Sequence, residues 1–424
     1  MKMEQKLFSK NFTLVVIGQI ISLFGNATIR FALPLYLLNQ TGSSALFGTV
    51  TACAFLPAIL LTPVGGIVAD RVNKRNIMVI LDFFTAAVIA VFSVLAGEVN
   101  LILLIVVTLM LLYGIAGAYQ PAVQASIPAL VSTGHIMEAN SVVNIISSLA
   151  ALSGPVLGGI LYSNYGLKPV LWVCTLCFVL SAVMELFIKI PFQRQESGGG
   201  VWKIVKKDFA ESIQFIRRDK PAIGKTVSVV CGVNLFLSAM ILVGLPYLVT
   251  EVMFDKAGYD SDYVNKLYGY AQGALAAGSL AGGIGAGVLV KKLKIQKTGN
   301  LLILCAAFVF PIAVSQMFSA SGMVCYLVMT LCCFIIMFFS TIFTVQMMSF
   351  MQMETPQELI GKVIAAVLMF SMCAQPLGNA LYGVLFDLCE GYEYVVILFA
   401  GSVSLVIAVC TKKIFEGFGE RGEA

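Results

Sequence analysis

The amino-acid sequence predicts an all-α integral membrane protein with twelve membrane-spanning helices in two pseudo-symmetric six-helix bundles. Three observations support this fold class. Of the 424 residues, 59% are hydrophobic and only 12% are charged, whereas soluble domains average about 45–50% and about 25%. Apolar blocks of about 20 residues, the length that crosses a bilayer, recur along the whole chain. The Lys and Arg residues fall almost entirely in alternate connecting segments.

Charged and turn residues set the limits of the predicted spans. The first apolar block is too long for a cleavable signal peptide, so we interpret it as the first span. The longest polar segment, 190–223, divides the chain into an N-terminal bundle (1–189), a linker with an amphipathic helix, and a C-terminal bundle (224–424). The predicted spans are 13–38, 45–69, 76–97, 100–122, 141–163, 169–189, 224–249, 264–290, 299–318, 323–350, 363–386 and 394–411.

The distribution of positive charge predicts the orientation in the membrane. If the N-terminus is cytoplasmic, 23 of the 27 Lys and Arg residues fall on the cytoplasmic side, three fall outside, and Arg30 lies within a span. Cytoplasmic loops of membrane proteins carry such an excess. We therefore expect a multi-pass protein of the bacterial plasma membrane with both termini and the linker in the cytoplasm.

The two predicted bundles resemble each other in sequence. Residues 33–37 and 245–248 both contain a Leu-Pro pair followed by a Tyr-Leu pair at the end of a span. Residues 155–162 and 376–382 share a Gly and a Leu-Tyr pair, with a proline displaced by one place. Weak internal symmetry with a substrate site between the repeats is a common plan of transporters.

A charged motif connects the second and third spans and contains Gly66, Asp70, Arg71, Lys74 and Arg75. A glycine in the position of Gly66 allows a neighbouring helix to approach closely. The Asp70 carboxylate suits the positive N-terminal end of an adjacent helix. The motif is therefore a candidate conformational latch, and the alternative is positive charge that only sets topology.

A second motif lies in the fifth span and contains Gly154, Pro155, Gly158 and Gly159. Proline within a span frees a backbone carbonyl and permits a bend, and the glycines form a face for close packing. The alternative is small-residue packing without a specific role in transport.

Ionisable residues inside spans are candidates for function. Burial raises the pKa of a carboxyl group and a nearby cation lowers it, so a carboxyl that alternates between such surroundings moves a proton. Asp82 and Glu185 are the candidates for proton coupling. Asp82 is alternatively the partner of Arg71, and Glu185 is alternatively paired with Lys189 at i,i+4 spacing. A proton gradient, without a cofactor, is the expected energy source.

Polar residues within spans are candidates for lining a substrate cavity, and each is alternatively a contact between helices. Arg30 could bind an anionic substrate group or pair with a carboxylate, and we favour pairing. The cavity candidates are Asn26, Arg30, Gln120, Gln124, Asn234 and Gln346.

Other functional classes lack support. The Cys174-x-x-Cys177 pair has no second ligand pair, so no metal site is expected. The sequence contains no hydrolase motif and no basic segment interleaved with aromatic residues, so we expect neither an enzyme nor a nucleic-acid-binding protein. The expected partners are the lipid bilayer and a small-molecule substrate, and we expect a monomer.

These motifs resemble those of a known family. The loop motif looks like the loop 2–3 signature of the major facilitator superfamily, and residues 154–159 resemble the helix 5 signature of its drug exporters. The resemblance implies the superfamily fold, alternating access and proton-coupled export of amphipathic, drug-like molecules. An alternative is a transporter or flippase of an anionic metabolite or lipid, which Arg30 would suit. The segments similar to the macrolide-efflux-like branch are 17–22, 41–43, 128–131, 139–140 and 355–363.

The chain departs from the family pattern in two places. The second copy of the loop signature, at 287–292, has Lys291 where the first has Asp70, so we expect only the first copy to latch. The fourth span reads Tyr119-Gln120-Pro121 where many drug antiporters carry an arginine. The coupling mechanism of those antiporters therefore does not transfer directly.

Overall fold

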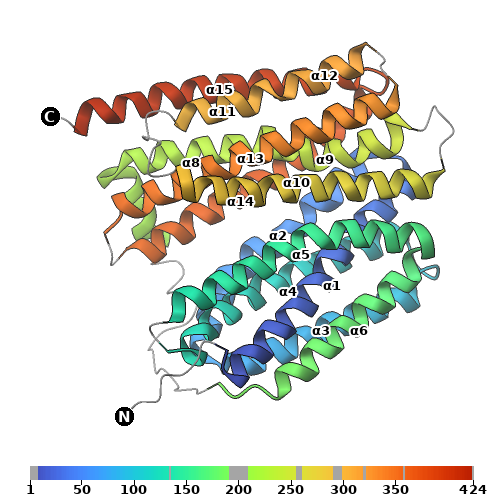
Figure 1. Cartoon of the computed structure of the whole chain (residues 1–424), viewed down its shortest axis with the longest axis vertical. Coiled ribbons are helices and arrows are strands. Elements are labelled where there is room, and N and C mark those ends of the chain that lie inside the picture. The colour runs from blue at the N-terminus through green and yellow to red at the C-terminus, as the bar shows by residue number, and fades with distance from the viewer. Residues whose placement is uncertain are drawn as a thin grey trace. The chain divides into compact units, whose positions relative to one another are not determined.

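The computed structural model of the chain is almost entirely helical in the residues it describes (Figure 1). The described residues are 8–132, 135–190, 209–254, 260–289, 298–318, 321–356 and 359–422.

The first half of the chain forms six long helices, which follow the predicted spans in order. They are α1 (Lys10–Thr41), α2 (Ser44–Arg71), α3 (Lys74–Leu95), α4 (Leu101–Leu130), α5 (Ile136–Tyr165) and α6 (Leu167–Leu186).

The second half contains longer helical runs, some of which are divided by short π-helical segments. The run 221–253 comprises α8 (Pro221–Val233), η3 (Asn234–Ser238), α9 (Ala239–Tyr247) and η4 (Leu248–Met253), and is preceded by η2 (Phe215–Asp219). The remaining helices are α10 (Ser261–Leu289), α11 (Thr298–Ala307), α12 (Val309–Met317), α13 (Gly322–Glu354), α14 (Ile360–Leu388) and α15 (Glu393–Gly422).

The structure confirms an all-helical membrane protein. Within the described residues, ten helices are long and apolar enough to cross a membrane. The helices α10 and α14 lie at the other two predicted spans. Large apolar side chains such as Leu60 and Val94 are 62% and 70% exposed, which suits contact with lipid. The amphipathic helix predicted in the linker lies partly outside the described residues, and its buried end includes Phe215 and Ile216.

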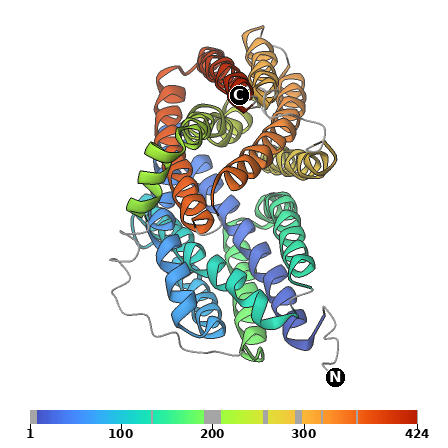
Figure 2. The same cartoon turned by 90° about the vertical axis from the view of Figure 1, so that its left-hand side faces the viewer.

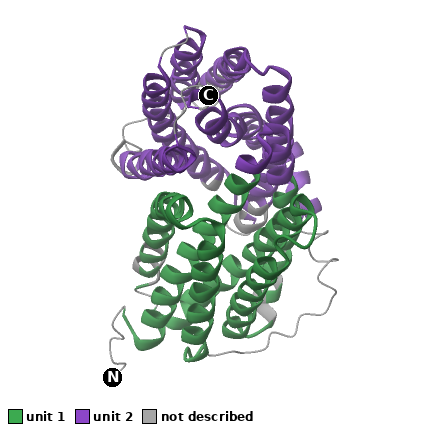
Figure 3. Cartoon of the chain, turned by 90° about the vertical axis from the view of Figure 1, so that its right-hand side faces the viewer, with its two compact units in different colours: residues 1–37, 53–205 green, residues 38–52, 206–424 purple. Residues whose placement is uncertain are grey.

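The chain divides into two compact units (Figure 3). Unit 1 comprises residues 1–37 and 53–205, and unit 2 comprises residues 38–52 and 206–424. The end of α1 and the first turns of α2, residues 38–52, therefore belong to the same unit as the C-terminal half of the chain.

Two helix contacts of unit 1 have counterparts in unit 2. In unit 1, α3 packs along α6, and in unit 2, α11 and α12 pack along α15 (Figures 1 and 2). Gly154 of α5 packs against α1, and Gly378 of α14 packs against η3 and α9. A Cβ atom at Gly154 would lie 2.3 Å from the Cβ of Ala27, and one at Gly378 would lie 2.3 Å from the carbonyl oxygen of Leu235. Glycine at these two positions permits the close approach.

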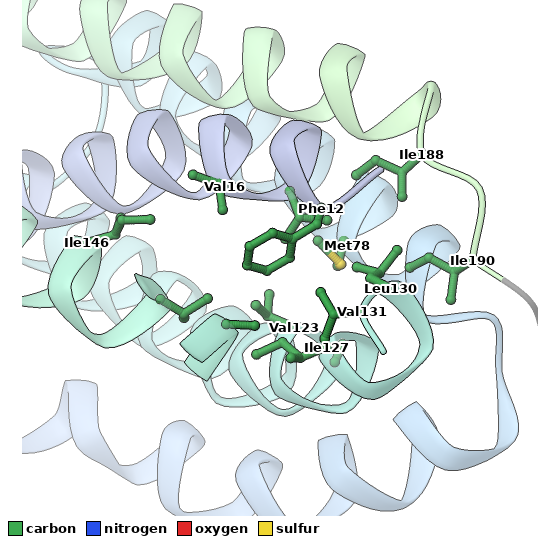
Figure 4. Close-up of a cluster of buried hydrophobic side chains, with 14 of the residues drawn as sticks. Phe12, Val16, Met78, Val123, Ile127, Leu130, Val131, Ile146, Ile188 and Ile190 are labelled. Atoms are coloured by element: carbon green, nitrogen blue, oxygen red, sulfur yellow. The ribbon is translucent and has the colours of Figure 1, made fainter. Parts of the chain in front are cut away.

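One hydrophobic core of unit 1 lies where α1 begins (Figure 4). Phe12 and Met78 are fully buried there, next to Ile127 of α4. Ile188 and Ile190, which follow α6, extend the same core. This core fixes the starts of α1 and α3 and the end of α6 to one another.

Candidate functional site

Two carboxyl groups are buried within unit 1. Asp82 of α3 is 2% exposed and Glu185 of α6 is fully buried. The packing of α3 along α6 places both residues inside the bundle. The Oδ1 atom of Asp82 accepts a 3.1 Å hydrogen bond from the hydroxyl of Ser22 on α1. The Oε1 atom of Glu185 accepts a 2.7 Å hydrogen bond from the hydroxyl of Tyr119 on α4.

Tyr119 connects Glu185 to the first helix. Its hydroxyl accepts a 2.6 Å hydrogen bond from the Nε2 atom of Gln19, which is fully buried. The hydroxyl of Ser181, one turn before Glu185, donates to the carbonyl of Gly18 at 3.1 Å. We call Gln19, Ser22, Asp82, Tyr119, Ser181 and Glu185 the acidic cluster.

The second oxygen of each carboxyl in the acidic cluster has no hydrogen-bond partner. These atoms are Asp82 Oδ2 and Glu185 Oε2, and both are buried. Among the described residues, no cationic side chain pairs with either carboxyl. A buried carboxylate without a cation is costly, and uptake of a proton removes the charge. The arrangement is therefore suited to binding and releasing protons.

The proposed pairing of Glu185 with Lys189 is not formed. The helix α6 ends at Leu186, so the i,i+4 geometry does not reach Lys189. Lys189 is exposed, whereas Glu185 points toward Tyr119 inside the bundle. The end of the helix thus separates the two charges.

The favoured pairing of Arg30 with a carboxylate is also absent within the described part of the chain. The Cζ atom of Arg30 lies 3.8 Å from the centre of the Tyr113 ring, a cation–π contact. Its Nη2 atom donates to the carbonyl oxygen of Leu112 at 3.2 Å, and its Nε atom is buried without a hydrogen-bond partner. Arg30 packs against the aromatic surface of α4, which supplies no carboxylate, so its positive charge is not neutralised there.

Two of the other cavity candidates form hydrogen bonds between helices of unit 2. Asn234 donates to the carbonyl of Ser371 at 3.0 Å and joins η3 to α14. Gln346 accepts a 2.7 Å hydrogen bond from Thr298 and joins α13 to α11. These contacts favour the interpretation that Asn234 and Gln346 join helices over the interpretation that they line a substrate cavity. The remaining candidates lie on unit 1 with partly buried or exposed side chains; they are Asn26, Gln120 and Gln124.

Much of the loop motif lies outside what the structure describes. The helix α2 ends at Arg71 and α3 begins at Lys74, but the side chains of Gly66, Asp70 and Arg71 are not described. Arg75 is described, and its Nη2 atom donates to the carbonyl of Leu186 at the end of α6. Arg75 therefore makes a bond within unit 1.

The helix 5 motif forms the contact between α5 and α1. In addition to Gly154, a Cβ atom at Gly158 would lie 3.4 Å from the side chain of Thr28. Gly159 is buried, and Pro155 lies inside α5 without ending it. The motif thus lies beside the helix that carries Ser22 and Gln19.

A third carboxyl, Asp387, lies at the end of α14 and caps the start of α2 within unit 2. Its Oδ1 atom accepts from the backbone N–H of Ser44 at 2.8 Å and from the Ser44 hydroxyl at 2.6 Å. Its Oδ2 atom accepts from the hydroxyl of Ser43 at 2.7 Å. A cavity of about 710 Å³ adjoins these residues and is also lined by Glu251 and Glu390.

Sequence reasoning did not assign a role to Tyr119, Gln19 or the capping by Asp387. A signal for part of the cluster was present, because Gln19 and Ser22 share one face of α1, and Ser181 and Glu185 share one face of α6. Nothing in the sequence showed which faces meet.

Comparisons with known proteins agree with this fold. Residues 15–379 match the family model described as Major Facilitator Superfamily. The chain is 23% identical to Macrolide efflux protein A of Streptococcus pyogenes over 410 residues, which cover 94% of each chain. It is 23% identical to Multidrug efflux pump Tap of Mycolicibacterium fortuitum over 369 residues, which cover 86% of each chain.

Solved structures of transporters have the same fold. The nucleoside transporter NupG superposes with a TM-score of 0.73 at 13% identity, covering 96% of this chain and 99% of its own. A bacterial homologue of the iron transporter ferroportin, in an inward-facing state, superposes with a TM-score of 0.68 at 16% identity. The match covers 95% of this chain and 98% of the homologue. The extent of the family match and the shared fold indicate a membrane transporter rather than an enzyme, and the chain belongs to the Major Facilitator Superfamily.

Proposed function

We propose that this transporter exports amphipathic small molecules in exchange for protons by alternating access. Membership of the superfamily supports transport, and the relatives named as macrolide and multidrug efflux proteins support export of such molecules. The acidic cluster supports the proton as the coupling ion. The observation that carries the proposal is the burial of Asp82 and Glu185 without a cation to neutralise either of them.

The proton cycle follows from the contacts of the acidic cluster. When Asp82 and Glu185 hold protons, the bundle contains no uncompensated negative charge at this level. When they release protons, each carboxylate needs water or hydrogen-bond donors, because an unpaired buried charge is costly. Opening of the bundle toward water supplies that solvation. Proton release therefore favours a conformation in which the acidic cluster is hydrated.

The contacts of the acidic cluster also transmit the change to other helices. Ser22 and Gln19 lie on α1, and Tyr119 lies on α4, so a change of charge at Asp82 or Glu185 alters bonds to both helices. The helix α1 in turn packs closely on α5 at Gly154. The protonation state is thus linked to the packing of α1, α4 and α5.

A second candidate function is transport of an anionic metabolite or lipid. The observation that favours it is Arg30, whose charge is not neutralised by a carboxylate within the described residues. An anionic head group would supply the missing counter-charge. The test is an Arg30→Gln variant. If this variant transports a zwitterionic or cationic macrolide at the normal rate but no longer transports anionic substrates, the result would favour this alternative.

The test of proton coupling uses the purified protein in proteoliposomes with an imposed pH gradient. Uphill transport of erythromycin and ethidium is measured together with their equilibrium binding. Asp82→Asn and Glu185→Gln should abolish uphill transport and leave binding within about twofold, because each removes a protonation site without removing volume. Substrate exchange without a gradient should continue in both variants.

The control is Asp262→Asn, which removes an exposed carboxyl at the start of α10. This variant should transport normally. Normal uphill transport in both Asp82→Asn and Glu185→Gln would exclude the acidic cluster as the coupling site and direct the search to Asp387.

A further inference from the structure

A recess of about 370 Å³ lies in unit 1 where α3 begins and where the chain leaves α6. It is lined by Asn73, Arg75, Ile188, Lys189 and Ile190. The charge bias of the sequence places this end of unit 1 on the cytoplasmic side. The proposed transport cycle assigns no role to the recess.

Local structure sets the walls of the recess. The side chain of Asn73 caps α3 by accepting from the backbone N–H of Arg75 at 3.1 Å. After α6, Ile188 and Ile190 are 1% and 8% exposed because they enter the core shown in Figure 4. Lys189 lies between them and is exposed. The backbone N–H of Lys189 donates a 3.2 Å hydrogen bond to Oδ1 of Asn11, and this bond holds residues 188–190 against the start of α1.

The recess carries positive charge that the described residues do not neutralise. Arg75 donates through Nη2 to the carbonyl of Leu186, and its Nε atom is buried without a hydrogen-bond partner. Neither Arg75 nor Lys189 forms an ion pair with a carboxylate of the described residues. The N-terminal end of α3 adds the positive end of its helix dipole. An anion in the recess would therefore meet two cations and a helix N-terminus.

Apolar surface adjoins this charge. Leu186 and Phe187 are 43% and 67% exposed beside the recess. A free anion gains nothing from such surface, whereas a phospholipid offers a phosphate and acyl chains together. Basic recesses between spanning helices on the cytoplasmic side suit anionic lipid head groups.

We propose that this recess binds the head group of an anionic phospholipid. The phosphodiester lies between Arg75 and Lys189, and the acyl chains pass along Leu186 and Phe187. The guanidinium group of Arg75 suits the planar pair of phosphate oxygens, and Lys189 acts as a point charge. This proposal does not depend on the proposed substrate or on the coupling ion.

The test measures lipid binding to the purified, delipidated full-length chain in detergent, by native mass spectrometry and by thermal unfolding. Phosphatidylglycerol should bind and raise the unfolding temperature, and phosphatidylcholine should do so much less. Lys189→Gln should weaken phosphatidylglycerol binding about fivefold, the effect expected for loss of one charge near a membrane surface. Arg75→Gln should weaken it at least as much.

Lys168→Gln is the matched control, because Lys168 is exposed at the opposite end of α6. It should leave phosphatidylglycerol binding unchanged. Within the described part of the chain, Lys189 forms a hydrogen bond through its backbone and none through its side chain, so its substitution tests the charge even if Arg75→Gln folds poorly. Unchanged binding in Lys189→Gln, equal binding of phosphatidylcholine, or equal stabilisation by inorganic phosphate would each overturn the proposal.

Discussion

The hydroxyl group of Tyr119 donates a 2.7 Å hydrogen bond to Oε1 of Glu185, in the interior of the N-terminal unit. The two residues are 66 positions apart in the chain, and they join α4 to α6. This bond is the only described contact that satisfies an oxygen of Glu185, since the Oε2 atom has no hydrogen-bond partner.

Tyr119→Phe should leave both oxygens of Glu185 without a donor at almost unchanged volume. Loss of a hydrogen bond to a buried group costs about 1–3 kcal/mol. We expect uphill transport to fall by about tenfold or more, and its pH profile to shift, because the relative free energies of the two protonation states of Glu185 change. Transport in proteoliposomes over a range of pH is the measurement. A purely structural role would lower the amount of folded protein and leave the pH profile in place.

Asp387→Ala should release the start of α2 from α14. The carboxylate accepts from the backbone and side chain of Ser44 and from Ser43, and loss of an N-cap costs about 0.5–2 kcal/mol. Hydrogen exchange of residues 44–52 should become faster, while the protein remains folded. Asp387→Asn, which keeps one acceptor, should have a smaller effect.

Glu390→Gln serves as the control for Asp387, because Glu390 lines the same cavity and is exposed. Its substitution should leave exchange of residues 44–52 unchanged. Equal exchange in Asp387→Ala and the parent protein would show that the cap does not stabilise this segment.

Gly154→Ala should destabilise the contact between α5 and α1. The added Cβ atom would lie 2.3 Å from the Cβ of Ala27, and overpacking of this kind costs about 1–3 kcal/mol. The unfolding temperature in detergent should fall, and Ala27→Gly in the same chain should restore part of the loss. Gly283→Ala, at a helical glycine with no heavy atom within 4 Å, should not lower it.

The topology prediction can be tested by labelling from each side of the membrane. In a chain whose 11 native cysteines have been replaced, single cysteines at Ser197 and Asp260 should react from opposite sides. The charge bias places position 197 in the cytoplasm and position 260 outside. Reaction of both from one side would contradict the arrangement of spans between them.

Asp70→Asn tests the latch predicted for the loop motif. We expect a folded protein with reduced transport that is biased away from the outward-facing state, because the variant removes the charge that suits a helix N-terminus. Labelling of single cysteines in the substrate cavity should change in the same direction. If cysteine labelling and transport in Asp70→Asn both equal those of the parent protein, the motif only sets the membrane topology and is not a latch.

The sequence by itself determined the class of the fold. A chain with 59% hydrophobic residues in blocks of about 20 can bury its backbone polar groups in a bilayer only as helices. The sequence also identified Asp82 and Glu185 as candidates, because charged residues inside apolar blocks are rare and easily recognised. It also placed Gly154 and Gly378 in corresponding spans, and the structure shows that both lie at helix contacts.

Only the tertiary structure decided which polar groups meet. The helix α6 is apolar on most of its circumference, so its sequence did not show that Glu185 faces Tyr119 rather than Lys189. The pairing of Asp387 with Ser44 spans 343 positions and depends on where α14 ends against the start of α2. The rotation of each helix about its axis and the place where it ends are fixed by packing against its neighbours, and these two quantities determine the contacts of every candidate residue.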